Sequence, residues 1–395
     1  MRIALALGLC LLAGSAATLL AAPATTTENT AKAQPAVKKK PVSPPSREAY
    51  RVRMNENVVT IMAGSPSGTD LAIVQDIAEI LDDGDALRVV PMVGKGPAQN
   101  VKDVMFLRGV DMGVTQANIL KHFASTGELG PNIASQIAYV AKLFNEEMHI
   151  LVRSETDDIK ALAGKPVNFG PSGSGTEITS RLIFAELGID VQARHLPETE
   201  AIEKLKAGEI DAAIVVTGKP APVLTALKDA KGLKLLPVPY AKQLEADYYP
   251  GTLTHEDYPA LVPEGTSVDT VAVCAVLVSF NWSGDNVRAR KTANFIDRFF
   301  NNFDALTKPP HHPKWREVNF AATLENWQRA PLAQKWIDRA NDTAAKASTA
   351  DGGGRRSFDT FLAQSAPSGG VSISEEERAS LFRAFLEWSK TRNGN

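Results

Sequence analysis

The chain has 395 residues, a formal net charge of −2 and 44% hydrophobic residues. This composition supports a sizeable globular core, and the balanced charge, without a basic and aromatic stripe, argues against nucleic acid as a partner. Beyond the first apolar stretch, no segment is long and uninterrupted enough to cross a membrane, so we expect the remainder to be soluble.

Residues 1–24 are predicted to be a secretory signal peptide. Met1-Arg2 precedes an apolar stretch from Ile3 to Leu20, and Ala22-Pro23-Ala24 supplies small residues at cleavage-site spacing. An uncleaved membrane anchor is the alternative. Export would place the mature chain in the periplasm, where Cys274 is its single cysteine; no intrachain disulfide is then possible, and a buried, inert thiol is expected.

Residues 25–57 are predicted to be a flexible linker. This segment is rich in Ala, Thr, Pro and Lys, and it contains Lys38-Lys39-Lys40 and Pro44-Pro45 without apolar residues that would form a core. We expect the lysines to be solvated and the folded part to begin at Val58.

From Val58 onward, apolar strand-like runs alternate with amphipathic helical runs, which predicts an α/β fold. Residues 58–152 are expected to form the first lobe. Its predicted strands and helices are Val58–Met62, Asp70–Asp82, Leu87–Val90, Ala98–Leu107 and Met112–Thr115. Within Asp70–Asp82, the apolar residues recur at helical spacing and make one buried face.

Residues 153–269 are expected to form a second lobe of the same kind. Its predicted elements are Val167–Phe169, Glu177–Leu187, Thr199–Ala207 and Ala212–Val216. The run His149–Arg153 crosses to this lobe, and Thr270–Phe280 crosses back. Residues 270–339 then return to the first lobe with a helix over Asn286–Phe303. Two crossings between two lobes make a hinge.

Residues 340–395 are expected to be a flexible segment followed by a C-terminal amphipathic helix. The segment is polar and Gly-rich up to Arg355-Arg356. Ser374 and Glu377 have capping-box spacing, and the helix they open carries one apolar face. We expect that face to dock on the protein itself, with a partner interface as the alternative.

Two small-residue loops each follow a strand and open a helix. They are Gly64–Asp70 and Gly170–Glu177, and in both a serine precedes an acid by three positions, Ser67 to Asp70 and Ser174 to Glu177. Glycines allow close approach of a ligand, and helix N-termini offer free N–H groups to an anion. The alternative is a tight turn with a well-capped helix.

The order and spacing of these motifs resemble the TRAP-associated extracytoplasmic immunogenic (TAXI) family of solute-binding proteins, which serve tripartite ATP-independent periplasmic (TRAP) transporters. The motifs are Ala63–Thr69, Gly113–Asn118, Met148–Arg153, Gly170–Thr176, Gly208–Ala212, Thr217–Pro220 and Thr270–Val273. The resemblance implies a two-lobed periplasmic binding protein fold of type II, with hinge crossovers. It also implies a small organic acid or amino acid as ligand and a membrane permease as partner.

Two departures from the family pattern leave the ligand open. Members commonly carry an aromatic residue where this chain has Asp70, and often Gly-Gly-Ser where it has Gly94-Lys95-Gly96. Lys95 and Lys219 lie in loops after strands, where a cation could neutralise an acidic ligand, although each alone suits a solvated lysine.

The residues predicted to bind the ligand lie at strand ends and loops of both lobes. They are Ser65, Ser67, Gly68, Thr69, Lys95, Gln116, Ser172, Gly173, Ser174, Gly175, Thr176, Thr217 and Lys219. Gln116 can both donate to a carboxylate and accept from an ammonium. Tyr258 is a further candidate at the cleft rim. The six histidines do not form a metal signature, and we expect no cofactor.

The sequence thus predicts a monomeric binding protein that is not an enzyme and that delivers its ligand to a TRAP-type permease. One alternative is a periplasmic sensor or adaptor with the same fold, which adjacent permease or sensor-kinase genes would distinguish. The other is a hydrolase using Ser67 or Ser174, for which no recognised motif supplies a base.

Overall fold

The structure is a computed structural model that describes residues 46–66, 68–228 and 230–350. Residues fall into two units, Met1–Ser46 and Arg47–Asn395, and the fold below is that of the second. The signal peptide, most of the predicted linker, Ser67 and the predicted C-terminal amphipathic helix lie outside the described residues. Among those described, no helix combines the length and apolar character needed to span a membrane.

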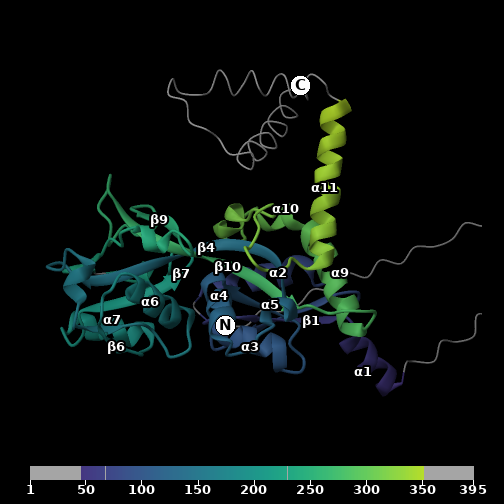
Figure 1. The fold of residues 1–395 in the computed structure, drawn as a ribbon, viewed down its shortest axis with the longest axis horizontal. Helices are drawn as coiled ribbons and strands as arrows, with labels where there is room; N and C mark the ends of the chain where they lie inside the picture. The colour runs from purple at the N-terminus through teal and green to yellow at the C-terminus, as the bar shows by residue number, and fades with distance from the viewer. Residues whose placement is uncertain (1–45, 67, 229, 351–395) are drawn as a thin grey trace, which may run out of the picture. The chain divides into compact units, whose positions relative to one another are not determined.

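A ten-stranded sheet organises the second unit, in the order β2-β1-β3-β10-β4-β7-β5-β6, with β8 paired to β4 and β9 paired to β10 (Figure 1). The strands are β1 Val58–Ala63, β2 Arg88–Val93, β3 Met112–Gln116, β4 Ile137–Arg153, β5 Pro166–Asn168, β6 Gln192–Arg194, β7 Ala212–Thr217, β8 Leu233–Leu235, β9 Tyr249–Thr254 and β10 Ser267–Phe280.

Two parallel sets of strands are joined by two long antiparallel strands. The first set is β2, β1 and β3, and the second set is β7, β5 and β6. β4 pairs with β10 through residues 137–147 and with β7 through residues 147–152, while β10 also pairs with β3. Figure 1 shows β4 and β10 running between the two ends of this sheet. The arrangement confirms the predicted α/β class with two crossing strands.

Helices connect the strands and cover the sheet. They are α1 Arg47–Glu56, α2 Thr69–Leu81, α3 Pro97–Phe106, α4 Ala117–Thr126, α5 Ile133–Gln136, α6 Gly175–Glu186, α7 Glu198–Lys206, α8 Pro222–Thr225, α9 Val287–Asn301, α10 Phe303–Leu306 and α11 Pro331–Ala350, with 3₁₀ turns at Ile159–Leu162, Lys242–Leu244 and Pro313–Glu317. In α2 the predicted apolar face is buried against β1 and α9 through Ile73, Val74, Ile77 and Leu81. Burial of that stripe holds α2 on the first set.

The predicted crossing strands are present and longer than expected. The crossing at His149–Arg153 is the end of β4, which starts at Ile137, and the crossing at Thr270–Phe280 begins at Ser267 in β10. Fourteen residues of β4 are buried, because the strand lies in the middle of the sheet with helices on both faces. The lobe boundaries at residues 152 and 269 stay predictions.

Two predicted flexible segments are partly helical. The expected linker 25–57 ends in α1, where Arg51 donates to Glu48 and where Gly and Pro are absent. The expected flexible segment from residue 340 begins inside α11, which continues to Ala350. Alanine-rich sequence favours helix, and the first glycine after it is Gly352. We had expected neither helix, because both segments are polar.

The two predicted capping boxes differ. Ser174 is the N-cap of α6, and its Oγ accepts from the amide of Glu177 at 3.1 Å, as predicted. Helix α2 instead begins at Thr69 with Gly68 as its N-cap and no side-chain cap, so the box at Ser67 and Asp70 is wrong. The side chain of Asp70 is buried rather than placed at the cap.

Loss of the Ser174 cap should lower the free energy of unfolding by about 1 kcal/mol. Ser174→Ala removes the acceptor for the Glu177 amide, so that N–H must bond water or stay without a partner. Urea unfolding followed by circular dichroism measures the change. Ser172→Ala, at an exposed position in the same loop, should leave stability nearly unchanged. Equal losses in the two variants would contradict the capping role.

Candidate functional site

The candidate site lies where the carboxyl ends of the two parallel sets face each other. Strands β1, β2 and β3 end at the Gly64–Gly68 loop, at the Gly94–Gly96 loop and at Gln116, and β5 and β7 end at the Gly170–Ser174 loop and at Thr217. Ligands of open α/β sheets bind at carboxyl ends of strands, because backbone donors and loop side chains converge there.

Two glycine loops, one from each set, lie in direct contact. A Cβ added to Gly96 would lie 3.0 Å from Ser174 Cα and 3.2 Å from the oxygen of Gly173. Gly96 also has a φ of 133°, which L-residues rarely adopt. Only glycine therefore lets the loop after β2 approach the N-terminus of α6 this closely.

Gln116 forms the second contact between the sets. A Cβ on Gly175 would lie 2.8 Å from Gln116 Nε2, so the amide lies against the first turn of α6. Thr179 of α6 donates to Gln116 Oε1 at 2.8 Å, and Asn118 donates to Thr179 Oγ1 at 2.9 Å. All of these polar side chains are buried. Gln116 thus carries hydrogen bonds that join the first set to α6 of the second, while its predicted contact with a ligand stays a prediction.

Thr69 forms the third contact, with the end of β7. Its hydroxyl donates to the oxygen of Gly218 at 2.9 Å, and Thr217 Oγ1 lies 3.3 Å from Thr69 Oγ1. A Cβ on Gly218 would lie 2.9 Å from Thr69 Cγ2. The structure therefore brings the N-terminus of α2 against the second set.

The predicted residues divide into three groups. Thr69, Gln116, Gly173, Ser174, Gly175 and Thr217 meet in the contacts just described. Gly68 closes a tight turn with Ser65, and Thr176 accepts from the Val216 amide at 3.0 Å. Ser65, Lys95 and Ser172 are exposed, and Lys219 is bound to Asp257 at 2.9 Å. Their roles in ligand binding stay predictions.

Two carboxylates that sequence reasoning left out lie beside these contacts. Asp70, on the first turn of α2, is 5% exposed, and its Oδ1 has no hydrogen-bond partner in the part of the chain that the structure describes. Glu146, on β4, is 3% exposed and accepts from Gln116 Nε2 at 2.7 Å. Burial raises the pKa of Asp70 to about 7. Burial and then the Asp70 charge raise the pKa of Glu146 well above its ordinary value.

The neighbouring carboxylate, Glu147, is paired. Lys314 Nζ lies 2.6 Å from its Oε1, and the Lys219 amide donates to its Oε2 at 2.9 Å. Lys314 is 2% exposed and also contacts Glu317. Burial raises the pKa of Glu147, although Lys314 acts against that rise. This ion pair ties the middle of β4 to the 3₁₀ turn at Pro313–Glu317.

Tyr258 lies in the core and not at a cleft rim, so that candidate is wrong. Its ring is 1% exposed, and its hydroxyl lies 2.7 Å from His149 Nε2 and accepts from the Ala221 amide at 2.7 Å. Burial lowers the pKa of His149 to about 4, which keeps the imidazole neutral. The expected buried thiol of Cys274 is confirmed, and burial raises its pKa to about 11.

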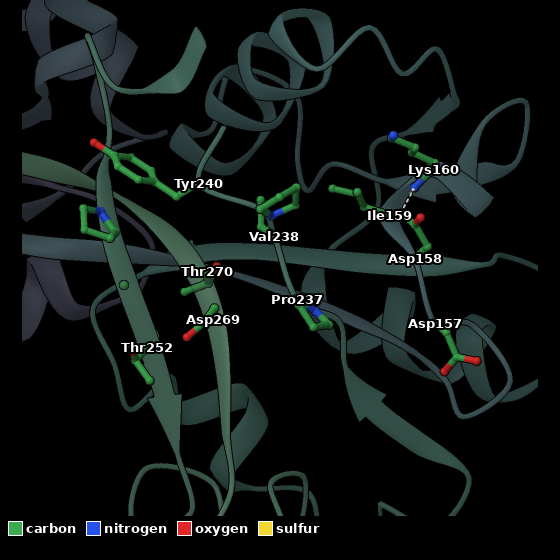
Figure 2. A pocket seen from close by; sticks show the side chains of 13 residues that line it. Asp157, Asp158, Ile159, Lys160, Pro237, Val238, Tyr240, Thr252, Asp269 and Thr270 are labelled. Carbon is green, nitrogen blue, oxygen red and sulfur yellow. Dashed lines mark hydrogen bonds between the residues drawn. The ribbon is translucent and has the colours of Figure 1, made fainter. Parts of the chain in front are cut away.

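Three surface pockets lie elsewhere, and no predicted ligand-binding residue lines them. Their volumes are about 660, 750 and 550 Å³. Figure 2 shows the first, with Asp158 and Lys160 at one end and Tyr240 and Thr252 at the other. Asp158 accepts from the Lys160 amide at 2.9 Å, so its carboxylate already closes a local turn.

One group of potential metal ligands is found among the described residues: Asp76, Glu79 and His311. Asp76 already accepts from the His312 amide at 2.8 Å and from Trp315 Nε1 at 2.8 Å. These bonds anchor the turn at Pro313–Glu317 to α2, so a structural role explains the carboxylate.

Two sequence signals mark these carboxylates. Asp70 stands where the TAXI family, which this chain resembles, commonly has an aromatic residue. Glu146 and Glu147 stand side by side in a largely apolar strand, Ile137–Arg153. Charged residues inside a buried strand need partners, and that need could have marked them.

Solved structures that are similar to this chain share little sequence identity with it. The periplasmic binding protein BugD is 14% identical over 75% of this chain and 98% of its own, with a TM-score of 0.44. A periplasmic transporter is 14% identical over 74% and 97%, with a TM-score of 0.45. A protein from Bordetella bronchiseptica RB50 is 15% identical over 67% and 76%, with a TM-score of 0.43. The fold assignment rests on the strand order of this chain, because these scores are low.

A family comparison covers the whole candidate site. The model of the NMT1-like family matches residues 61–325. That range includes both parallel sets apart from the first three residues of β1, both long strands, the three contacts between the sets and the buried carboxylates, and it is more than half of the chain. The chain belongs to the NMT1-like family.

Proposed function

We propose that the protein is a periplasmic solute-binding protein that captures a small organic acid or amino acid and delivers it to a TRAP-type membrane permease. The observation that carries this proposal is the contact between loops of the two parallel sets, with the buried Gln116 hydrogen-bonded on both sides. The TAXI resemblance supports the permease partner, and the apolar N-terminal stretch supports export.

Closure on the ligand is the proposed mechanism. The two sets are joined by β4 and β10, which can serve as the hinge, and the contacts at Gly96, Gln116 and Thr69 belong to a closed form. A ligand that touches both sets only in this form shifts the population toward it, and the permease then recognises the closed surface.

No observation favours the hydrolase. Among the described residues, no histidine ring or carboxylate hydrogen-bonds Ser174 Oγ, which instead accepts from the Glu177 amide. A nucleophile needs a base within hydrogen-bond reach. A sensor and a transporter subunit would bind the ligand in the same way, so the neighbouring genes distinguish these two functions. An adjacent gene for a many-spanning permease supports delivery, whereas an adjacent gene for a sensor kinase contradicts it.

Ligand binding should raise the unfolding temperature of the purified protein. A solute at a hundred times its dissociation constant adds about 2.7 kcal/mol to the free energy of unfolding. Thermal-shift screening of carboxylates, amino acids and amines measures this effect. A screen without any stabilising solute, together with turnover of an ester or amide, would contradict the proposal.

A glycine variant tests closure in the same screen. Gly96→Ala places a methyl group against Ser174 Cα and should weaken binding of every solute that stabilises the parent. Gly127→Ala is the matched control, because Gly127 also has a positive φ, 67°, but no atom lies within 4 Å of an added Cβ. Equal binding losses in both variants would attribute the effect to backbone strain and contradict the closed-form contact.

A further inference from the structure

The carboxylates of Asp70 and Glu146 form a buried pair of like charge. Both side chains are more than nine-tenths buried, and Asp70 Oδ1 has no hydrogen-bond partner among the described residues. Glu146 has one recorded bond, from the amide of Gln116. The two charges act on each other, since Asp70 raises the pKa of Glu146. A buried pair of like charges is costly unless something compensates it.

The nearby lysines are already bound to other groups. Lys314 is held by Glu147 and Glu317, at 2.6 and 2.8 Å. Lys219 is held by Asp257 and by the oxygen of Thr252, and Lys142 donates to Tyr249 Oη at 3.0 Å. Lys314 lowers the pKa of Glu146, but its influence is weaker than those of burial, Asp70, Gln116 and Glu147. Among the described residues, no lysine or arginine forms an ion pair with Asp70 or Glu146.

The pair is flanked by the bonds that join the two sets of strands. Asp70 follows Thr69, which bonds Gly218 at the end of the second set. Glu146 bonds Gln116, which in turn accepts from Thr179 on α6. A Cβ on Gly64 would lie 3.0 Å from Asp70 Oδ2, so glycine at that position makes room for the carboxylate beside the first loop. The charges therefore lie within the closed contact itself.

We infer that the closed form holds a protonated nitrogen of the solute between Asp70 and Glu146, so that the solute is an amino acid or an amine and not a purely acidic metabolite. This inference rests on the proposed function. An ammonium brings a positive charge and up to three N–H donors to carboxylates that accept only. An acidic solute without nitrogen would instead bring a negative charge beside two carboxylates whose ionised forms burial already disfavours.

A metal ion fits the pair less well than an ammonium. Among the described residues, the group of three potential His, Cys, Asp or Glu ligands is the one at Asp76, and neither Asp70 nor Glu146 belongs to it. Calcium sites normally take six to eight oxygen ligands. Two carboxylates with an amide already bonded between protein groups are better suited to a nitrogen cation.

Calorimetry with four classes of probe tests the inference. The probes are α-amino acids (alanine, glutamine and lysine), amines without carboxylates (putrescine and cadaverine), dicarboxylates (succinate and 2-oxoglutarate) and calcium chloride. At least one nitrogen-containing probe should bind the parent protein, and Asp70→Asn and Glu146→Gln should each weaken it by at least about 30-fold. Preference between the first two classes tells whether the solute also carries a carboxylate.

A matched variant controls for the loss of one negative charge. Glu48→Gln makes the same change on the exposed helix α1, where Glu48 pairs with Arg51, and should leave affinity unchanged. Dicarboxylates that bind equally well to the parent, Asp70→Asn and Glu146→Gln would overturn the inference and leave the proposed function standing. Calcium binding that both site variants abolish would also overturn it. Failure of every probe, with all proteins folded, would contradict the proposed function itself.

Discussion

Replacing Lys314 by methionine should lower the free energy of unfolding by about 3–5 kcal/mol, the cost of removing one partner from a buried ion pair. Lys314 is 2% exposed and lies 2.6 Å from Glu147. Without it, the Glu147 carboxylate keeps the Lys219 amide as a donor but loses its counter-charge in the middle of β4. The loss of stability should therefore be large at neutral pH. There the Glu147 carboxyl must either stay ionised without a counter-charge or bind a proton.

Chemical unfolding of three variants separates charge from packing. Glu147→Gln in the Lys314→Met background should recover much of the loss, because the uncompensated charge is gone. The exposed pair Lys204–Glu209 is the control, since its side chains are 34% and 58% exposed, and Lys204→Met should cost no more than about 1 kcal/mol. Equal losses at Lys314 and Lys204 would show that burial of the first pair does not matter.

Asp70→Asn should raise the stability of the ligand-free protein by up to about 4 kcal/mol above pH 7, and by little near pH 4. Burial raises the pKa of Asp70 from 3.8 to about 7, and that interval corresponds to about 4 kcal/mol. Between these pH values the folded protein binds more protons than the unfolded chain. Stability of the parent should therefore fall as the pH rises from about 4 to about 7.

The measured quantity is the difference in unfolding free energy between parent and variant from pH 4 to pH 8. Taking the difference removes the opposing effect of His149, whose pKa burial lowers to about 4. Glu146 and Glu147 on β4 and Lys314 on the neighbouring turn also face this region. Asp83→Asn should have the opposite sign, because the Leu87 and Asp85 amides and Arg298 lower the pKa of Asp83. A pH-independent difference for Asp70→Asn would contradict the buried, unpaired carboxylate.

The two predictions describe different uses of buried charge. Glu147 is compensated within the protein by Lys314, so loss of the partner destabilises. Asp70 has no such partner among the described residues, so loss of the charge stabilises the ligand-free protein and, by our inference, weakens binding of the solute. Binding sites commonly trade stability for function in this way.

Apolar periodicity predicted most of the central elements. The buried face of α2, the short strands β1, β3 and β7, and the helices α3, α6, α7 and α9 lie within a few residues of their expected positions. Each of these helices buries one apolar stripe, and each of these strands is a short apolar run. The pattern that predicts them is therefore visible in the local sequence. The short strands β6, β8 and β9 were missed, because three to six residues without a strong pattern pair only when a longer strand is beside them.

The candidate site was predicted unevenly. Ser174 caps its helix as expected, because capping depends on residues three apart in the chain. The amide of Gln116 and its place at a strand end predicted a ligand contact; the structure shows bonds to Glu146 and Thr179, and the ligand contact stays a prediction. Lys95 was chosen by the same kind of argument, yet its side chain is exposed, since a loop sequence does not fix the direction of a side chain.

The sequence by itself determined the α/β class, the two crossing strands and the serine cap of α6, because period, apolar run length and capping spacing are local properties. Only the tertiary structure decided that Asp70 and Glu146, far apart in the chain, are buried together beside the contact of the two strand sets. The burial of a charge depends on which distant segments cover it, and the cost of that burial is what now points to the ligand.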